Sequence, residues 1–240
     1  MTPDSMDAVA KVARDVGYRS ADRYQARCKF LFDGVRLTGA RVLDVGCGRG
    51  ALALWAGLHG ASHVLGIEPE SDGSTQGMLS SFQGTIDKLG LGPVVKSRAC
   101  FLEDITPSDG CFDVVVLFNV INHLDEKAVT SLHTSKDSAE SYTKVLRHLR
   151  TIVADGGSVI VADCGRRNFW NDIGLRNPLM PTIEWHKHQQ PKLWASIFEG
   201  AGFALHDLRW SPLYPLGAIT SNWPVHYFTA SHFTLRFKAV

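Results

Sequence analysis

The chain has 240 residues, a formal net charge of +1, and a composition of 45% hydrophobic and 20% charged residues. This length suits one large α/β domain with an added segment, and the balanced charge gives no electrostatic reason to expect an extended nucleic-acid-binding surface. The longest apolar stretch, 114–121, is too short to span a membrane. The first 14 residues lack the apolar core of a secretory signal peptide, so we expect a cytoplasmic protein with reduced cysteines and no membrane partner.

Apolar runs and helical patterns alternate along the first two thirds of the chain. In order, the sequence predicts a helical segment over 6–33, strand 41–45, helix 51–58, strand 63–67, helix 71–89, strand 94–99, strand 112–118, helix 138–154 and strand 158–162. Short links between alternating strands and helices are typical of a doubly wound, mostly parallel sheet. The loops that follow its strands would share one edge, where such folds bind ligands.

The regular pattern stops after this last strand. Residues 164–190 contain no clear element, and a loop of this length inside a compact domain is usually functional or mobile, so we predict a substrate lid. The remaining elements are predicted as helix 192–200, strand 203–210, loop 211–224 and final strand 225–239. We therefore expect a helical cap, 1–37, followed by one α/β domain, 38–240, that carries the lid.

The most informative segment is a glycine-rich turn between the first predicted strand and helix. Residues 42–50 read Val-Leu-Asp-Val-Gly-Cys-Gly-Arg-Gly, and Glu68 ends the next strand 18 residues after the last glycine. Glycines let the backbone approach a ligand without an intervening Cβ, and the following helix presents free N–H groups. An acid at the end of the second strand can accept hydrogen bonds from both hydroxyls of a ribose. The unit therefore predicts a nucleoside-binding site.

Two families use glycine turns of this kind. Residues 46–51 fit the fingerprint G-x-G-x-x-G/A of NAD(P)-dependent oxidoreductases. Through residues 44–50 and Glu68, however, the sequence resembles the class I S-adenosylmethionine-dependent methyltransferases, in which an acid such as Asp44 precedes the first glycine. No Tyr-x-x-x-Lys pair is visible to support an oxidoreductase. A non-catalytic nucleoside-binding protein is a further alternative, because Cys100 stands where the family usually has an aspartate.

The resemblance implies S-adenosyl-L-methionine as the cofactor and a Rossmann-like, doubly wound, mostly parallel seven-stranded sheet whose last strand is antiparallel. It assigns Glu68 to the ribose and the residues after the third strand to the adenine. It assigns Asp44 and the backbone near Gly46 and Asn119 to the methionyl ammonium group. The full set of predicted cofactor-binding residues is Asp44, Gly46, Cys47, Gly48, Gly50, Glu68, Phe101, Leu102 and Asn119.

Three histidines are candidates for a catalytic general base, because histidine can take up a proton at neutral pH. Residues 112–125 resemble the fourth-strand block of the family, and His123 follows the end of that strand. His186 and His188 lie two apart in the predicted lid, where an extended backbone would place them on one face. Such a pair also suggests a metal site. No acidic or cysteine partner lies at useful spacing, so we predict no metal.

The acceptor of the methyl group is predicted only by class. Asn-Val-Ile-Asn at 119–122 replaces the Asn/Asp-Pro-Pro-Tyr/Phe sequence of many amino-group and nucleic-acid-base methyltransferases. The resemblance therefore implies a small-molecule acceptor and no nucleic acid, with a metabolite or sugar hydroxyl expected before a small amine. Arg166 and Arg167 are candidates to hold an anionic group, and Trp170 and Trp185 are candidates to line a ring-binding pocket. The sequence leaves the oligomeric state open.

Overall fold

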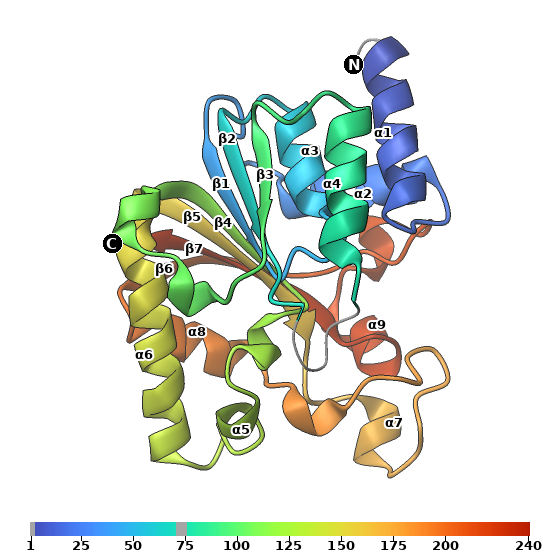
Figure 1. The fold of residues 1–240 in the computed structure, drawn as a ribbon. Coiled ribbons are helices and arrows are strands. Elements are labelled where there is room, and N and C mark those ends of the chain that lie inside the picture. Colours follow the sequence, from blue (N-terminus) through green and yellow to red (C-terminus); the bar gives the residue numbers. More distant parts are fainter. Residues whose placement is uncertain (1–2, 71–75) are drawn as a thin grey trace. The chain divides into compact units, whose positions relative to one another are not determined.

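The structure, a computed structural model, describes residues 3–70 and 76–240 of the chain (Figure 1). Its strands are β1 (Arg41–Val45), β2 (His63–Ile67), β3 (Val95–Arg98), β4 (Phe112–Phe118), β5 (Val153–Cys164), β6 (Phe203–Trp210) and β7 (His232–Ala239). They form one sheet in the order β3-β2-β1-β4-β5-β7-β6. β1, β2 and β3 pair in parallel, and β6 pairs antiparallel with β7. The predicted doubly wound sheet with an antiparallel last strand is confirmed.

The helices are α1 (Pro3–Asp15), α2 (Ala21–Leu31), α3 (Ala51–Leu58), α4 (Met78–Lys88), α5 (Glu126–Val129), α6 (Lys136–Ile152), α7 (Phe169–Asp172), α8 (Pro191–Glu199) and α9 (Trp223–Phe228). The chain forms two compact units. Unit 1 comprises residues 1–116 and 152–158, and unit 2 comprises residues 117–151 and 159–240. β4 and β5 therefore contribute residues to both units.

In unit 1, α3 and α4 pack beside β1, β2 and β3 (Figure 1). The apolar side chains of β1 and β2 are buried, as their predicted character requires. Phe82 of α4 is fully buried, and its ring lies where a Cβ on Gly66 or Gly50 would be, 2.7 and 2.1 Å from the nearest ring atom respectively. Two glycines thus let α4 pack closely on β2 and on the turn after β1.

The N-terminal helices also belong to unit 1. The predicted segment 6–33 forms two helices, with Gly17 at a φ of 85° in the break between them. Tyr24 of α2 is fully buried, its hydroxyl donates to the Ala51 carbonyl at 2.7 Å, and its ring meets Trp55 edge-on at 5.7 Å. Because Ala51 begins α3, α2 is fixed to the helix that follows the glycine turn.

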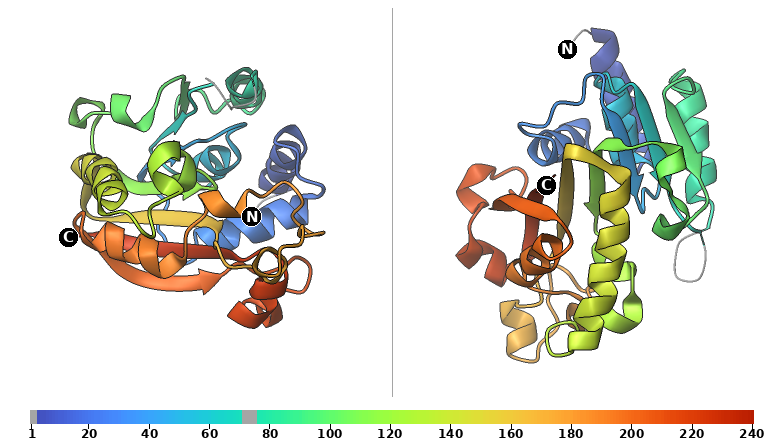
Figure 2. Two further views of the ribbon diagram at one scale, coloured as in Figure 1. Left: turned by 90° about the horizontal axis from the view of Figure 1, so that it is seen from below. Right: turned by 90° about the vertical axis from the view of Figure 1, so that its left-hand side faces the viewer.

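In unit 2, α8 packs against β6 and β7 (Figure 2). Phe198 of α8 stacks on Phe237 of β7, with 4.2 Å between ring centroids and an interplanar angle of 11°. Trp194 of α8 meets Tyr142 of α6 edge-on at 5.0 Å. All four rings are fully buried, so aromatic packing holds α6 and α8 to the C-terminal hairpin.

Three predicted boundaries are wrong or fall partly outside the described residues. The predicted final strand, 225–239, begins only at His232, because Asn222 caps α9 by accepting the Val225 N–H at 3.1 Å and Pro224 occupies its first turn. The helix predicted over 138–154 ends at Ile152, and β5 begins at once. The helix predicted over 71–89 appears as α4, and its residues 71–75 lie outside the described part.

Candidate functional site

The glycine turn after β1 adopts the conformation that its sequence predicts. Gly46, Gly48 and Gly50 have φ values of 64°, 52° and 76°, in the left-handed region that favours glycine. The Cys47 N–H donates to the Ile67 carbonyl at 2.9 Å, which fixes the turn to the end of β2. Burial raises the pKa of the Cys47 thiol far above its ordinary value, so the side chain is a neutral packing group.

Glu68 lies at the turn, as predicted for a ribose-binding acid. It directly follows β2, its side chain is largely buried, and its Oε2 accepts the Gly48 N–H at 3.0 Å. Its own N–H donates to the Arg98 carbonyl at 3.2 Å. The carboxylate is therefore held in place through one oxygen, while Oε1 makes no hydrogen bond with any residue in the described part of unit 1.

Asp44 is a buried carboxylate beneath the same turn. It is 2% exposed, and its Oδ2 accepts the Ala53 N–H near the start of α3 at 3.0 Å. Burial raises its pKa to about 7, the Ala53 N–H lowers it, and the charge of Glu68 raises it further. A nearby cation would stabilise the ionised form of this buried carboxylate. The turn therefore fits a nucleoside that carries positive charge, as S-adenosylmethionine does.

The segment after β3 differs in detail from the prediction for adenine binding. Phe101 is 54% exposed, whereas Leu102 is buried. Asp104 accepts the Phe101 N–H at 2.9 Å, which removes that donor from those expected to meet the adenine ring. Asp104 thus has a local structural partner, and the neighbouring Glu103 is exposed.

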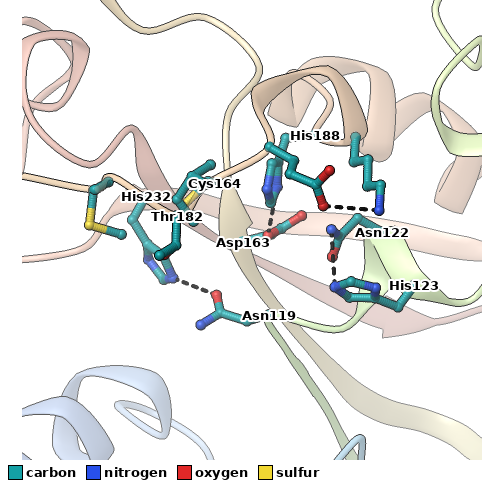
Figure 3. A pocket seen from close by; sticks show the side chains of 12 residues that line it. Asn119, Asn122, His123, Asp163, Cys164, Thr182, His188 and His232 are labelled. Carbon is teal, nitrogen blue, oxygen red and sulfur yellow. Dashed lines mark hydrogen bonds and ion pairs between the residues drawn. The ribbon is translucent and has the colours of Figure 1, made fainter. Parts of the chain in front are cut away.

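Unit 2 contains a pocket of about 280 Å³ (Figure 3). Its walls come from the segment after β4, from the last two residues of β5, from the predicted lid and from the first residue of β7. The lining residues are Asn119, Asn122, His123, Asp163, Cys164, Met180, Thr182, Ile183, Glu184, Lys187, His188 and His232. Two of the three candidate bases, His123 and His188, are among them, and half of the lining comes from residues 180–188.

Asp163 and His188 form a buried pair in this pocket (Figure 3). Asp163 ends the apolar run of β5 and is 1% exposed, and its Oδ1 lies 3.1 Å from Nδ1 of the buried His188. An ionised carboxylate only accepts hydrogen bonds, so the Nδ1–H of His188 donates to it, and in the neutral imidazole Nε2 then carries the lone pair. Nε2 makes no hydrogen bond within the described residues. The pair therefore presents a proton acceptor to the pocket.

His123 has a different environment. Its Nδ1 donates to Glu126 Oε1 at 2.8 Å, and its Nε2 accepts from Asn122 Nδ2 at 3.4 Å. The hydrogen bond from His123 lowers the pKa of Glu126. Lys187 lies 3.4 Å from Glu126 and 3.0 Å from Glu184, which links the lid to α5. Both nitrogens of His123 are thus engaged at the rim of the pocket.

His186 is exposed and does not line the pocket. A short 3₁₀ turn, Trp185–Lys187, replaces the extended backbone expected here, so the prediction that His186 and His188 share a face is wrong. Among the described residues, no group of three or more His, Cys, Asp and Glu side chains could hold a metal ion.

Two arginines and two tryptophans considered for substrate binding have structural partners. Arg167 pairs with Asp172 at 2.9 Å, and Arg166 donates to the His186 carbonyl at 3.0 Å. Trp170 of α7 donates to the Phe228 carbonyl of α9 at 3.0 Å. Trp185 is buried. None of the four lines the pocket, so nothing in unit 2 supports the predicted roles.

Sequence reasoning missed a polar chain beside the pocket. Asn119, at a φ of 55°, donates its N–H to the Ala162 carbonyl at 2.8 Å, and its Oδ1 lies 3.1 Å from His232 Nε2. Nδ1 of His232 lies 2.7 Å from the Ser211 hydroxyl. The sequence did not indicate a pocket residue at His232, because the pattern of its segment predicts a continuous strand. Asp163 was easier to recognise, because it is a carboxylate directly after an apolar predicted strand.

A sequence profile described as a methyltransferase domain matches residues 16–208. The ubiquinone biosynthesis O-methyltransferase of Rattus norvegicus is 36% identical over 184 residues, which are 73% of this chain and 47% of that protein. The human protein of the same name is 29% identical over 184 residues, 73% of this chain and 44% of that protein. The chain thus spans about half the length of these curated relatives.

A solved SAM-dependent methyltransferase from Aquifex aeolicus matches the whole chain over its own whole length with a TM-score of 0.61 at 15% identity. At this identity the match supports the fold, and the fold includes the antiparallel β7. In the part of the chain that the structure describes, no helix is long and apolar enough to cross a membrane. All five cysteines are free.

Proposed function

Because the chain belongs to the class I S-adenosylmethionine-dependent methyltransferases, we propose that it transfers a methyl group to a hydroxyl oxygen of a small-molecule acceptor. The family match and the antiparallel β7 argue against the alternative that the glycine turn belongs to an NAD(P)-dependent oxidoreductase. The observation that supports an oxygen acceptor is the Asp163–His188 pair, since an alcohol benefits from a general base. The names of the curated relatives support the same chemistry.

Unit 1 provides the groups that would bind the cofactor. The left-handed glycines open the turn, Glu68 keeps one carboxylate oxygen for a ribose hydroxyl, and Asp44 favours a neighbouring positive charge. Residues 101–102 of the same unit also belong to the predicted set, and Asn119, the remaining predicted residue, belongs to unit 2. When bound, S-adenosylmethionine supplies an electrophilic methyl group on a sulfonium sulfur. We also propose that residues 1–37 act as a cap on this unit.

Unit 2 provides the acceptor pocket. Its volume of about 280 Å³ lies near the lower end of the range for small-molecule sites, roughly 300–1,000 Å³, so it suits an acceptor with about one ring. Seven of its lining residues come from the segment 164–190, which supports the role of that segment as a substrate lid. Met180 and Ile183 give the pocket an apolar side, and His188 and Asp163 give it a polar one.

His188 acts as the general base. Its Nε2 takes the proton of the acceptor hydroxyl as the oxygen–methyl bond forms and the sulfur–methyl bond breaks, and Asp163 holds the ring and stabilises the imidazolium. His123 anchors the rim through Glu126, because both of its nitrogens are engaged. His186 has no place in the step, because its side chain lies outside the pocket.

The test is methyl transfer by the full chain to a panel of small alcohols, phenols and amines, read by mass spectrometry as the gain of one methyl group. We expect the methyl group on an oxygen atom of the product. Amine products alone would replace the oxygen acceptor with an amine. No product from any acceptor, with S-adenosylhomocysteine bound in calorimetry, would favour the non-catalytic nucleoside-binding alternative.

A further inference from the structure

A network of hydrogen-bonded side chains in unit 2 runs from the interior to the wall of the pocket. Nε2 of His232 lies 3.1 Å from Oδ1 of Asn119 (Figure 3), and Nδ1 of His232 lies 2.7 Å from the Ser211 hydroxyl. That hydroxyl lies 3.4 Å from the hydroxyl of Thr234. Ser211, His232 and Thr234 are buried, whereas Asn119 is exposed and lines the pocket. Asn119 is therefore the end of the network that a ligand in the pocket can meet.

The fold holds both ends of the Asn119–His232 hydrogen bond in left-handed backbone. Asn119 has a φ of 55°, and Ser231, the residue before His232, has a φ of 48°. Non-glycine residues seldom adopt this conformation, which persists only where the surrounding structure enforces it and is common at functional sites. The Asn119 N–H donates to the Ala162 carbonyl at 2.8 Å, and the buried Ser231 hydroxyl donates to the Arg167 carbonyl at 2.7 Å. Both ends are therefore fixed by hydrogen bonds of their own.

The hydrogen bonds of the network have one direction. A neutral imidazole donates through one nitrogen and accepts through the other. Because the amide oxygen of Asn119 can only accept, Nε2 of His232 is the donor, and Nδ1 accepts from the Ser211 hydroxyl. The amide nitrogen of Asn119 makes no hydrogen bond with any residue in the described part of unit 2. The network thus holds the amide by its oxygen and leaves its N–H groups available to a ligand.

We propose that Asn119 is a specificity-determining residue whose amide N–H binds a neutral oxygen, a carbonyl or an ether, on the molecule that is methylated. His232 is the positioning residue that holds the amide in this orientation. The inference rests on the proposed oxygen methylation and adds a chemical feature of the acceptor. Ser211 is 2% exposed, so it supports His232 and does not touch the ligand.

The charges around the pocket indicate that the bound oxygen is neutral. Asp163 and Glu184 contribute carboxylates to the lining. Lys187, whose ammonium pairs with both Glu184 and Glu126, is the only lysine or arginine among the lining residues that the structure describes. A carboxylate or phosphate on the acceptor would meet this excess of negative charge. A carbonyl or ether oxygen needs only a neutral donor, which the Asn119 amide provides.

The first experiment replaces one oxygen of the acceptor with a methylene group. On the full chain, 2-, 3- and 4-methoxyphenol are compared with the matching ethylphenols, and tetrahydropyran-4-ol is compared with cyclohexanol. Binding to protein saturated with S-adenosylhomocysteine is measured by calorimetry, and methyl transfer is measured by mass spectrometry. We expect at least one oxygen-containing probe to bind about three- to tenfold more tightly than its hydrocarbon partner, with a higher kcat/KM, because it gains one hydrogen bond.

The outcomes separate this inference from the proposed reaction. Equal binding and equal kcat/KM within every pair would overturn the inference and leave oxygen methylation standing. Tighter binding of an oxygen-containing probe without any methylated product would support the Asn119 site and count against the reaction. Failure of every oxygen-containing probe to bind would also overturn the inference.

Variants of Asn119 provide the second test. Asn119→Asp keeps the shape and tolerates left-handed backbone, but an acceptor replaces the N–H donor. The preference for the oxygen-containing probe should disappear, while affinity for S-adenosylhomocysteine stays within about twofold. Asn119→Gly suits the same backbone and removes the side chain without adding charge. A preference that survives in both variants would overturn the inference. So would a loss of affinity for S-adenosylhomocysteine with the preference kept, because the amide would then bind the cofactor.

The role of His232 has its own variant and a matched control. His232→Phe keeps a ring beside Phe118, whose centroid lies 5.7 Å away, and removes the hydrogen bond to Asn119, so the ratio of kcat/KM within the preferred pair should fall at least about twofold. His226→Phe should keep that ratio, because His226 is fully buried, stacks on Trp210 at 5.5 Å and does not line the pocket. Equal loss of activity on both probes in His232→Phe, with the ratio unchanged, would overturn the positioning role.

Discussion

The glycine turn of unit 1 and the pocket of unit 2 differ in how their buried polar groups are hydrogen-bonded. In the turn, Asp44 and Glu68 each accept a backbone N–H, from Ala53 and Gly48, so the site is ordered by the chain itself. In the pocket, oxygens of Asp163 and Asn122 have no partner among the described residues. Backbone N–H groups therefore order the acids of the turn, whereas the acids and amides of the pocket keep oxygens that no described residue pairs.

The largest expected effect comes from removing the base in the pocket. His188→Asn should lower kcat by roughly 10²- to 10⁴-fold, because no group remains to take the hydroxyl proton. Affinity for S-adenosylhomocysteine, measured by calorimetry, should stay within twofold, since His188 belongs to the acceptor pocket. Turnover close to that of the unchanged protein would end the assignment of His188 as base.

In the glycine turn, a substitution should change affinity for the cofactor instead of the rate of the proton transfer. Glu68→Ala should weaken S-adenosylhomocysteine binding by about 1–3 kcal/mol, because ribose hydroxyls and the Gly48 N–H both lose an acceptor. Glu68→Gln, which keeps an acceptor for Gly48, should lose less. Calorimetry on the two variants measures the contrast. Unchanged affinity in Glu68→Ala would refute the ribose assignment.

Asp44 gives the turn a pH dependence. Its folded-state pKa of about 7 is above its ordinary value, so the folded protein holds a proton that the unfolded chain releases between about pH 4 and 7, and stability falls as pH rises through this window. Asp44→Asn should therefore raise the free energy of unfolding by roughly 1–3 kcal/mol at pH 8 and change it little at pH 4.

Urea unfolding at the two pH values checks this sign. If Asp44→Asn raised the free energy of unfolding by the same amount at both pH values, ionisation of Asp44 would not be the cause. Affinity for S-adenosylmethionine should also fall in Asp44→Asn at pH 8, because the buried negative charge that favours a cationic ligand is gone.

The smallest effect is expected at the rim of the pocket. His123→Gln should slow turnover by less than about tenfold, because the side chain anchors Glu126 and does not take the acceptor proton. Steady-state kinetics with the best acceptor from the panel gives the comparison. A loss of roughly 10²-fold or more, with normal folding, would move the role of base from His188 to His123.

The same contrast explains what the sequence could predict. The turn is contiguous in sequence and needs left-handed backbone at Gly46, Gly48 and Gly50. Glycine at these three positions therefore predicts its conformation. Glu68 was found because the end of β2 is a fixed place in the topology. The doubly wound order and the antiparallel β7 followed from the alternation of elements and from the family resemblance.

The pocket was harder to predict because its groups come from separate segments. His188 becomes buried only because a 3₁₀ turn before it directs His186 outward. His232 was read as mid-strand, and only the Asn222 cap of α9 shows where β7 begins. Nor does the sequence show which acceptors remain unpaired, since pairing depends on distances between side chains that no spacing rule gives.

The pairing of Asp163 with His188 is the central claim, and Asp163→Asn tests it most directly. The amide keeps the shape but donates to His188 Nδ1, which moves the ring proton to Nε2 and removes the acceptor for the substrate proton. The measurement is kcat with an acceptor that the unchanged protein methylates, and the affinity for S-adenosylhomocysteine is the control. We expect kcat to fall by at least roughly 10²-fold with affinity unchanged. A variant that turns over within a few-fold of the unchanged protein would contradict the account.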